Sequence, residues 1–291
     1  MFSIIVPTFN NLDYVKILLL SLRKNSTMNH EIIFHINNGS DGTFDYLKKN
    51  NFKYTFTENN VGLCTGTNLA VSKATSQYIL YCHDDMYFCP GWDDALNKEL
   101  NQIDTKAFYI SGTMIEKSSG HIQIDCGNDH KDFDEAKLLR NFDKIKYFNY
   151  QGSHWAPHLI HKEYWDRVGG FSEEFNPGIG SDPDLNMKLW RAGVRIFKGL
   201  SAFRVYHFGS IVLRKKKNIN RNKGAKTFLT KWGFTPTFFL KYYLRGDIYE
   251  ENIIKSKEFD GPLKDPIKDI FYFISLFVCK IKLIYFKIFR F

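Results

Sequence analysis

The sequence lacks the cysteine pattern of a disulfide-bonded or zinc-binding protein. Its cysteines number five, an odd count, and none of them forms a Cys-x-x-Cys pair. This excludes a small disulfide scaffold and a zinc finger, and we expect reduced thiols in a cytosolic protein. The five are Cys64, Cys82, Cys89, Cys126 and Cys279.

Long apolar runs are also missing. No stretch has the roughly 18 uninterrupted apolar residues of a membrane-spanning helix. The apolar run at residues 2–7 is too short for a signal peptide and lacks a basic start. We find no internal repeat and no low-complexity segment. The sequence therefore predicts a globular chain without a spanning segment.

Acidic residues are in deficit, which points to anionic partners. Lys and Arg number 40 against 31 Asp and Glu, for a net charge of +9. The positive charge lies mainly after residue 195 and in the C-terminal tail. It does not lie on a nucleic-acid-reading motif. We therefore expect diphosphate and lipid as partners rather than nucleic acid.

The first hundred residues alternate between strand and helix patterns. Strands are expected at 2–7, 31–36, 53–57 and 78–81, and helices at 12–23, 44–49 and 62–74. This alternation predicts an α/β fold with a mainly parallel sheet and helices on both faces.

The second half is less regular. Residues 107–150 mix short strands with polar turns. Strand patterns follow at 158–161, 195–197 and 203–207, and helix patterns at 162–168 and 184–191.

Two adjacent carboxylates follow the predicted strand at 78–81. Ligands of open α/β sheets bind outside the carboxyl ends of the strands, where Asp84 and Asp85 would lie. Two desolvated carboxylates need a cation. Oxygen ligands suit Mg²⁺ or Mn²⁺, which are commonly shared with substrate phosphates. A solvated turn is the alternative interpretation.

Several short motifs add to this pair, and their order is informative. They are FSIIVPTFN (2–10), NNGSDGT (37–43), ENNVG (58–62) with Asn68, HDD (83–85), PGW (90–92), VGGF (168–171), SDPDL (181–185), RAG (191–193) and KWG (231–233). Over about residues 2–233 the chain resembles the family 2 glycosyltransferases, which have the GT-A fold. The resemblance implies a catalytic unit at 1–225, with a nucleotide-sugar half at about 1–105 and an acceptor half at about 106–225.

The resemblance also implies which residues hold the donor. They are Pro7, Thr8, Asn10, Asn37, Gly39, Asn60, Gly62, Asn68 and Asp84, with Lys215 from the basic cluster RKKK at 214–217 beside the diphosphate. The family usually has Asp where Asn37 stands. Asp can only accept a hydrogen bond, as from uracil N3–H, whereas Asn accepts or donates. UDP is the expected nucleotide, with dTDP and CDP as alternatives.

The metal site and the base follow from the same resemblance. Asp85 aligns with the metal-binding acid of the family and His207 with its late histidine. His83 stands where the family has a first Asp, and its imidazole would suit Mn²⁺ better than Mg²⁺. Asp182 aligns with the catalytic base and Asp184 is the second candidate. A purely structural role for Asp182, as the N-cap of a helix beginning at Pro183, is the alternative.

The acceptor and the tail complete the expectation. His154 and Trp155 are candidates for holding a glycan or lipid-linked acceptor, and a core role for Trp155 is the alternative. Residues 226–291 are expected to be helical, and 266–291 carry a net charge of +4 (five basic residues, one acid). The apolar run at 270–279 has the length of an interfacial segment. We expect it to attach to an anionic membrane surface, the inner face of the cell membrane, although packing on the chain or on a second copy is the alternative.

Together these features predict an inverting, metal-dependent glycosyltransferase of surface polysaccharide synthesis. A sugar-nucleotide nucleotidyltransferase would need a Gly-rich basic loop after the first strand, and TFNNL (8–12) contains neither Gly nor Lys. A catalytically silent scaffold remains an alternative, because positions 37, 83 and 181 lack the acids of the family.

Overall fold

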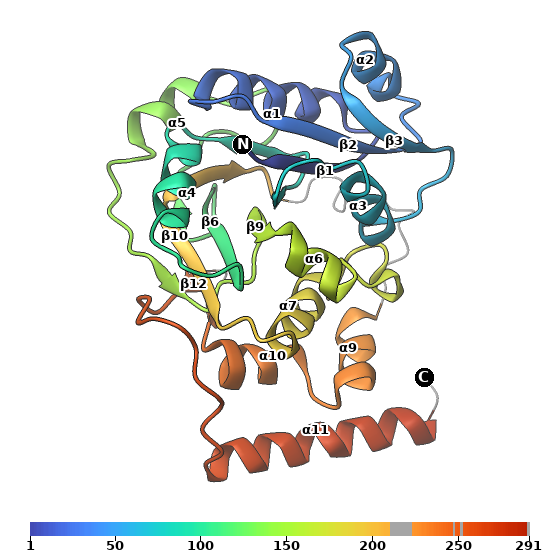
Figure 1. The fold of residues 1–291 in the computed structure, drawn as a ribbon, viewed down its shortest axis with the longest axis vertical. Helices are drawn as coiled ribbons and strands as arrows, with labels where there is room; N and C mark the ends of the chain where they lie inside the picture. The colour runs from blue at the N-terminus through green and yellow to red at the C-terminus, as the bar shows by residue number, and fades with distance from the viewer. Residues whose placement is uncertain (210–222, 247, 251–252, 290–291) are drawn as a thin grey trace.

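The computed structural model describes residues 1–209, 223–246, 248–250 and 253–289. Its centre is a mixed sheet with strand order β3-β2-β1-β4-β9-β6-β10-β5 (Figure 1). The sheet comprises β1 (Ser3–Phe9), β2 (Glu31–Asn37), β3 (Lys53–Thr57), β4 (Tyr78–Tyr81), β5 (Met86–Phe88), β6 (Phe108–Glu116), β9 (His158–His161) and β10 (Ile196–His207), with β7 (Ile122–Gln123) and β8 (Tyr150–Gln151) at its margins.

The N-terminal half of the sheet is parallel, as the alternating pattern predicts. β1 pairs in parallel with both β2 and β4, and β2 pairs in parallel with β3. The connecting helices are α1 (Leu12–Asn25), α2 (Thr43–Lys49) and α3 (Leu63–Val71). The carboxyl ends of β1, β2 and β4 therefore meet at one edge, where a ligand would bind. The predicted α/β class is confirmed.

The second half introduces antiparallel strands. β9 runs antiparallel to β4 and β6, and β5 runs antiparallel to β10. Two expectations were wrong here. The strand patterns at 195–197 and 203–207 belong to one strand, β10, because a register shift between Leu200 and Arg204 lets it continue beside β6. Residues 108–116 form one nine-residue strand rather than short pieces, because β6 is buried between β9 and β10.

The remaining helices follow β5 in the chain. They are α4 (Trp92–Leu100), α5 (Glu135–Asn141), α6 (Lys162–Val168), α7 (Ser181–Arg191), α9 (Gly224–Trp232), α10 (Pro236–Phe239) and α11 (Ile270–Phe289), with short helices at Glu173–Phe175 and Leu240–Leu244 and a hairpin of β11 (Ile248–Glu250) and β12 (Ile253–Lys255). Phe228, Phe239 and Leu263 belong to the same hydrophobic core as the sheet. The described residues after 225 therefore pack against the core of the sheet.

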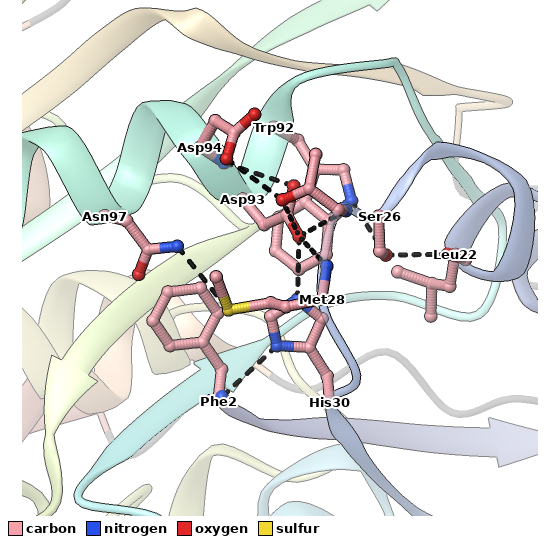
Figure 2. A network of polar contacts seen from close by, with 10 residues as sticks. Phe2, Leu22, Ser26, Met28, His30, Trp92, Asp93, Asp94 and Asn97 are labelled. Carbon is pink, nitrogen blue, oxygen red and sulfur yellow. Dashed lines mark hydrogen bonds and ion pairs between the residues drawn. The ribbon is translucent and has the colours of Figure 1, made fainter.

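A buried polar cluster fixes the start of β1 against α4 (Figure 2). One carboxylate oxygen of Asp93 accepts hydrogen bonds from the backbone N–H groups of Thr27 (2.8 Å) and Met28 (3.2 Å) and lies 3.1 Å from Nε2 of His30. His30 Nδ1 accepts the N–H of Phe2, whose ring stacks on the imidazole at 5.0 Å. These bonds hold in place the strand whose other end reaches the site.

Candidate active site

A cavity of about 450 Å³ opens at the carboxyl ends of β1, β2 and β4. It also receives residues from β6, from the end of β10 and from the start of α7, so both halves of the chain build it. Of the residues predicted from sequence, its walls contain Pro7, Thr8, Asn37, Asn60, Gly62, His83, Asp84, Asp85, Trp155, Asp182 and His207. The sheet edge thus brings together most of the predicted site.

The β1–β2 side of the cavity presents hydrogen-bonding groups in fixed orientations. Asn37 Oδ1 accepts the backbone N–H of Val61 at 2.9 Å, and Asn60 Oδ1 accepts that of Gly62 at 2.9 Å. The hydroxyl of Thr8 is buried, and among the described residues it has no hydrogen-bond partner. Such an unsatisfied hydroxyl at a cavity wall is a group that a ligand can engage.

Three residues predicted to hold the donor lie outside the cavity lining. Asn10 adopts a positive φ of 48° and donates to Asn38 and Ser40. Gly39, at φ 74°, allows the tight turn after β2, since a Cβ there would lie 2.8 Å from Ile36. These two residues shape the turns that follow β1 and β2.

The third residue outside the lining, Asn68, bridges the two halves of the chain. Its amide donates to the carbonyl of Phe171 (2.8 Å), and its oxygen accepts the N–H of Phe171 (3.0 Å). Asn68 therefore fixes the loop that leads toward α7. Lys215 and the rest of the basic cluster at 214–217 lie outside the described residues.

His83, Asp85 and His207 form a candidate metal centre. One potential ligand atom from each lies within 4.8 Å of the others. His207 Nε2 is 3.4 Å from Asp85 Oδ1, and it makes no hydrogen bond with the described residues. A buried, unsatisfied imidazole nitrogen facing a carboxylate fits a divalent ion.

Electrostatics agrees with a cation at this position. Burial opposes protonation of His207, yet the carboxylates of Asp85 and Glu116 raise its pKa to about 10. Burial and the neighbouring charge of His207 lower the pKa of His83 to about 4. The cluster therefore favours one positive charge between His207 and Asp85, which a metal ion would supply in place of the proton.

Asp182 and Asp184 occupy different environments on α7. The helix begins at Ser181, three residues earlier than predicted, because Gly180 takes the N-cap position at a φ of 88°. Asp182 therefore lies in the first turn and is not the N-cap. Its Oδ1 is buried at the cavity and has no hydrogen bond with the described residues, and burial raises its pKa to about 7.

Asp184 instead belongs to a network behind the cavity. Its carboxylate accepts hydrogen bonds from Ser172 Oγ at 2.6 Å and Trp232 Nε1 at 2.8 Å, and pairs with Lys231 Nζ at 2.9 Å. The side chain is fully buried. These contacts join α7 to α9 and indicate a structural carboxylate.

Sequence reasoning did not single out Glu116, the last residue of β6. It lines the cavity, and its Oε1 lies 2.6 Å from His207 Nδ1. The signal in the sequence is weak, because the pattern at 107–115 that ends in this carboxylate is interrupted by Ser111, Gly112 and Thr113. What the sequence does not show is that β6 lies beside β10.

Comparison with known proteins identifies the chain. The model of glycosyl transferase family 2 matches residues 3–159, more than half of the 291 residues. The chain belongs to glycosyltransferase family 2. No curated protein sequence matches it.

Solved glycosyltransferases share the GT-A fold of this family member. S. aureus TarS residues 1–349 superposes with a TM-score of 0.55 at 17% identity, over 71% of this chain and 60% of TarS. The same TarS fragment with UDP-GlcNAc superposes with a TM-score of 0.55 at 16% identity, over 81% of this chain and 74% of TarS. GalNAc-T7 with UDP, GalNAc and Mn²⁺ superposes with a TM-score of 0.55 at 16% identity, over 82% of this chain and 46% of GalNAc-T7. The chain thus spans less than two thirds of the first TarS structure and about half of GalNAc-T7.

The predicted acceptor residues of this glycosyltransferase are placed differently from one another. Trp155 lines the cavity, as Asp182 does. His154 is buried behind it, with ring centroids 4.3 Å apart and Nδ1 3.4 Å from the carbonyl oxygen of Gly152. Trp155 can therefore contact a ligand directly, whereas His154 supports its ring.

Proposed function

We propose that the chain transfers a sugar from a nucleoside diphosphate sugar, a UDP-sugar foremost, to a hydroxyl group of a glycan or lipid-linked acceptor, with inversion at the anomeric carbon. The observation that carries the proposal is the position of Asp182. Its carboxylate, whose Oδ1 is buried, lines the same cavity as the His83–Asp85–His207 centre. An acid that activates an acceptor and a site for a diphosphate thus share one cavity.

Asp182 is suited to act as the general base. Burial brings its pKa to about 7, close to the ideal for proton transfer near neutral pH. In the proposed step the acceptor O–H bond breaks and its proton passes to the Asp182 carboxylate. The acceptor oxygen attacks the anomeric carbon as the bond to the diphosphate oxygen breaks, so the nucleoside diphosphate leaves with that electron pair.

Asp85 and His207, with His83 beside them, would hold the divalent ion, Mn²⁺ or Mg²⁺. Such an ion neutralises charge that develops on a leaving diphosphate. TarS and GalNAc-T7 have both been determined with UDP, and GalNAc-T7 also with Mn²⁺. These complexes support, at the level of the fold, a UDP-sugar and Mn²⁺ as the first ligands to test.

Incubation of the purified chain with single UDP-, dTDP- and CDP-sugars, Mn²⁺ and a lipid-linked glycan acceptor tests the proposal. We expect glycosylated acceptor and free nucleoside diphosphate in equal amounts, with the anomeric configuration inverted. Donor binding without product across a broad acceptor panel would instead indicate a scaffold. A retained anomeric configuration would contradict the single displacement.

Helix α11 supports association with an anionic membrane surface. Figure 1 shows it on the side of α9 and α10 that faces away from the sheet. Tyr272 and Cys279 are buried, and Leu276, Leu283 and Phe286 are half-buried against the core. Other large apolar side chains of the helix are exposed, as are Lys280 and Lys282. Among the described residues, no helix is long and apolar enough to cross a membrane.

Exposed apolar side chains together with basic residues match the interfacial region of an anionic bilayer. The exposed apolar residues are Ile270, Phe271, Phe273, Ile274, Phe277, Val278, Ile281, Ile284, Tyr285 and Ile288. We place the chain at the inner face of the cell membrane, where a lipid-linked acceptor of surface polysaccharide synthesis would be in reach of the cavity.

A further inference from the structure

We propose that Glu116 is a positioning residue that fixes the tautomer and ring orientation of His207, so that Nε2 presents its lone pair to the metal ion. The inference rests on the proposed metal centre and adds a residue to it. Glu116 lies on β6 and His207 on β10, two neighbouring strands of the sheet.

The sheet register places the two side chains together. Tyr206 pairs with Ile115 in the parallel β6–β10 ladder, so the next residue of each strand is also adjacent. Glu116 Oε1 lies 2.6 Å from His207 Nδ1. Both side chains are largely buried, with 13% and 7% exposed. A short, shielded contact of this kind restricts the imidazole to one orientation.

The carboxylate is itself held in place. Its other oxygen accepts a hydrogen bond from Ser119 Oγ. Gly120 packs close by, since a Cβ there would lie 3.1 Å from Glu116 Cγ. The turn after β6 therefore helps to hold Glu116 in place.

The chemistry of imidazole gives this contact its consequence. In neutral histidine one ring nitrogen donates and the other accepts. A metal ion would take the place of the second proton of His207, and the proton that stays on Nδ1, donated to Glu116, would leave Nε2 as the acceptor. Nε2 is the nitrogen that lies 3.4 Å from Asp85 without a hydrogen bond among the described residues. Carboxylates behind metal-binding histidines act in this way and increase ligand basicity.

A purely structural ion pair would have a different effect. It would stabilise the fold by joining β6 to β10, and its loss would lower the melting temperature without weakening metal binding beyond the effect of partial unfolding. The two roles therefore separate when metal affinity is measured on folded protein well below the melting temperature.

The test measures Mn²⁺ binding to the full chain without donor. Binding is monitored as the loss of the free Mn²⁺ signal in electron paramagnetic resonance. The variants are Glu116→Ala, Glu116→Gln, His207→Ala and the double variant Glu116→Ala/His207→Ala. Glu135→Gln is the matched control, because Glu135 is also a partly buried carboxylate, bonded to Tyr87 and Lys24 away from the cluster.

We expect Glu116→Ala to weaken Mn²⁺ binding by about 10–100-fold, the usual cost of losing such an outer partner. Glu116→Gln should fall between it and wild type, because the amide oxygen still accepts from Nδ1 but carries no charge. In the His207→Ala background, Glu116→Ala should have no further effect. Glu135→Gln should bind Mn²⁺ like wild type.

Unchanged Mn²⁺ affinity in Glu116→Gln and Glu116→Ala would overturn the inference. Full additivity of Glu116→Ala and His207→Ala would overturn it as well, because it would show that Glu116 does not act through His207. If Glu116→Ala fails to fold, the isosteric Glu116→Gln variant and its combination with His207→Ala decide the question. Because no turnover is measured, absent glycosyl transfer would refute the proposed reaction without affecting this result.

Discussion

His207 Nε2 lies 3.4 Å from a carboxylate oxygen of Asp85, and strand pairing brings them together. Asp85 immediately precedes β5, and His207 is the last residue of β10. β5 and β10 are antiparallel, with His207 opposite Met86. The backbone N–H of Phe208 also donates to the carbonyl of Asp85. The candidate metal centre is therefore built into the edge of the sheet.

Asp182→Asn should separate donor binding from turnover. The amide cannot accept the acceptor proton, so we expect turnover to fall by about 10²–10⁴-fold while donor affinity stays within about twofold. Steady-state kinetics and calorimetric donor titration measure the two quantities. Wild-type turnover in this variant would exclude Asp182 as the base.

The pH dependence of the wild type follows from the same carboxylate. Because the base must be ionised and its pKa is about 7 in the chain without substrate, kcat/KM should rise with pH below about 7 and level off above it. The pKa of Asp182 is higher in the folded chain, about 7, than in the unfolded chain, near 3.8. Its ionisation therefore lowers the free energy of unfolding as the pH rises through this range. Asp182→Asn should therefore melt higher than wild type at pH 8, and this gap should shrink toward pH 4. Equal melting temperatures at pH 8 would contradict the burial argument.

Asp184→Ala should affect stability rather than chemistry. It would leave the Trp232 N–H without its buried partner, whereas Lys231, which is 26% exposed, would keep its ion pair with Glu174. We therefore expect a loss of about 1–3 kcal/mol of unfolding free energy. Urea unfolding measures the loss. Turnover of the fraction that remains folded at low temperature should stay within about tenfold of wild type. A loss of turnover equal to that of Asp182→Asn, in folded protein, would move the base to Asp184.

Asn37→Asp should shift the choice of base toward uracil. The Val61 N–H holds Asn37 Oδ1, so the amide NH₂ is the group left to contact a base. A carboxylate there accepts uracil N3–H and repels the lone pair of cytosine N3. We expect the UDP to CDP affinity ratio to rise by about tenfold, or 1.4 kcal/mol. Competition titrations measure it, and an unchanged ratio would show that Asn37 does not read the base.

Phe271→Ser/Phe277→Ser should weaken binding to liposomes rich in anionic lipid. The two side chains are 65% and 63% exposed, so folding is expected to persist. Losing two inserted Phe side chains should reduce partitioning by more than about tenfold. Leu20→Ser, which removes a similarly exposed residue of α1, is the control and should bind like wild type. Unchanged sedimentation of the double variant with liposomes would favour a protein partner for α11.

Local patterns in the sequence account for the nucleotide half. The strand at β1, the turn after β2 and the apolar run before Asp84 are each encoded within a few residues, and parallel βα repetition then sets the sheet order. The assembly of the site depends on contacts between distant segments. The register of β10 beside β6, which brings Glu116 to His207, is such a contact and has no local signature.

Contacts between distant segments also decide the environments of the two acids of α7. The motif places Asp182 before Asp184 as the base, but the environment of Asp184 depends on the packing of α9, which delivers Lys231 and Trp232. Likewise, Asn68 matches a family block but bonds to Phe171 of the second half. A motif gives the residue type, whereas the direction of its side chain depends on the tertiary fold.

Anomalous diffraction from crystals soaked with Mn²⁺ and UDP tests the central claim most directly. We predict a manganese peak bonded to Asp85 and His207, with the UDP diphosphate on the same ion and Asp182 across the cavity. A manganese ion or diphosphate bound away from Asp85, or a cavity that takes up neither, would contradict the account.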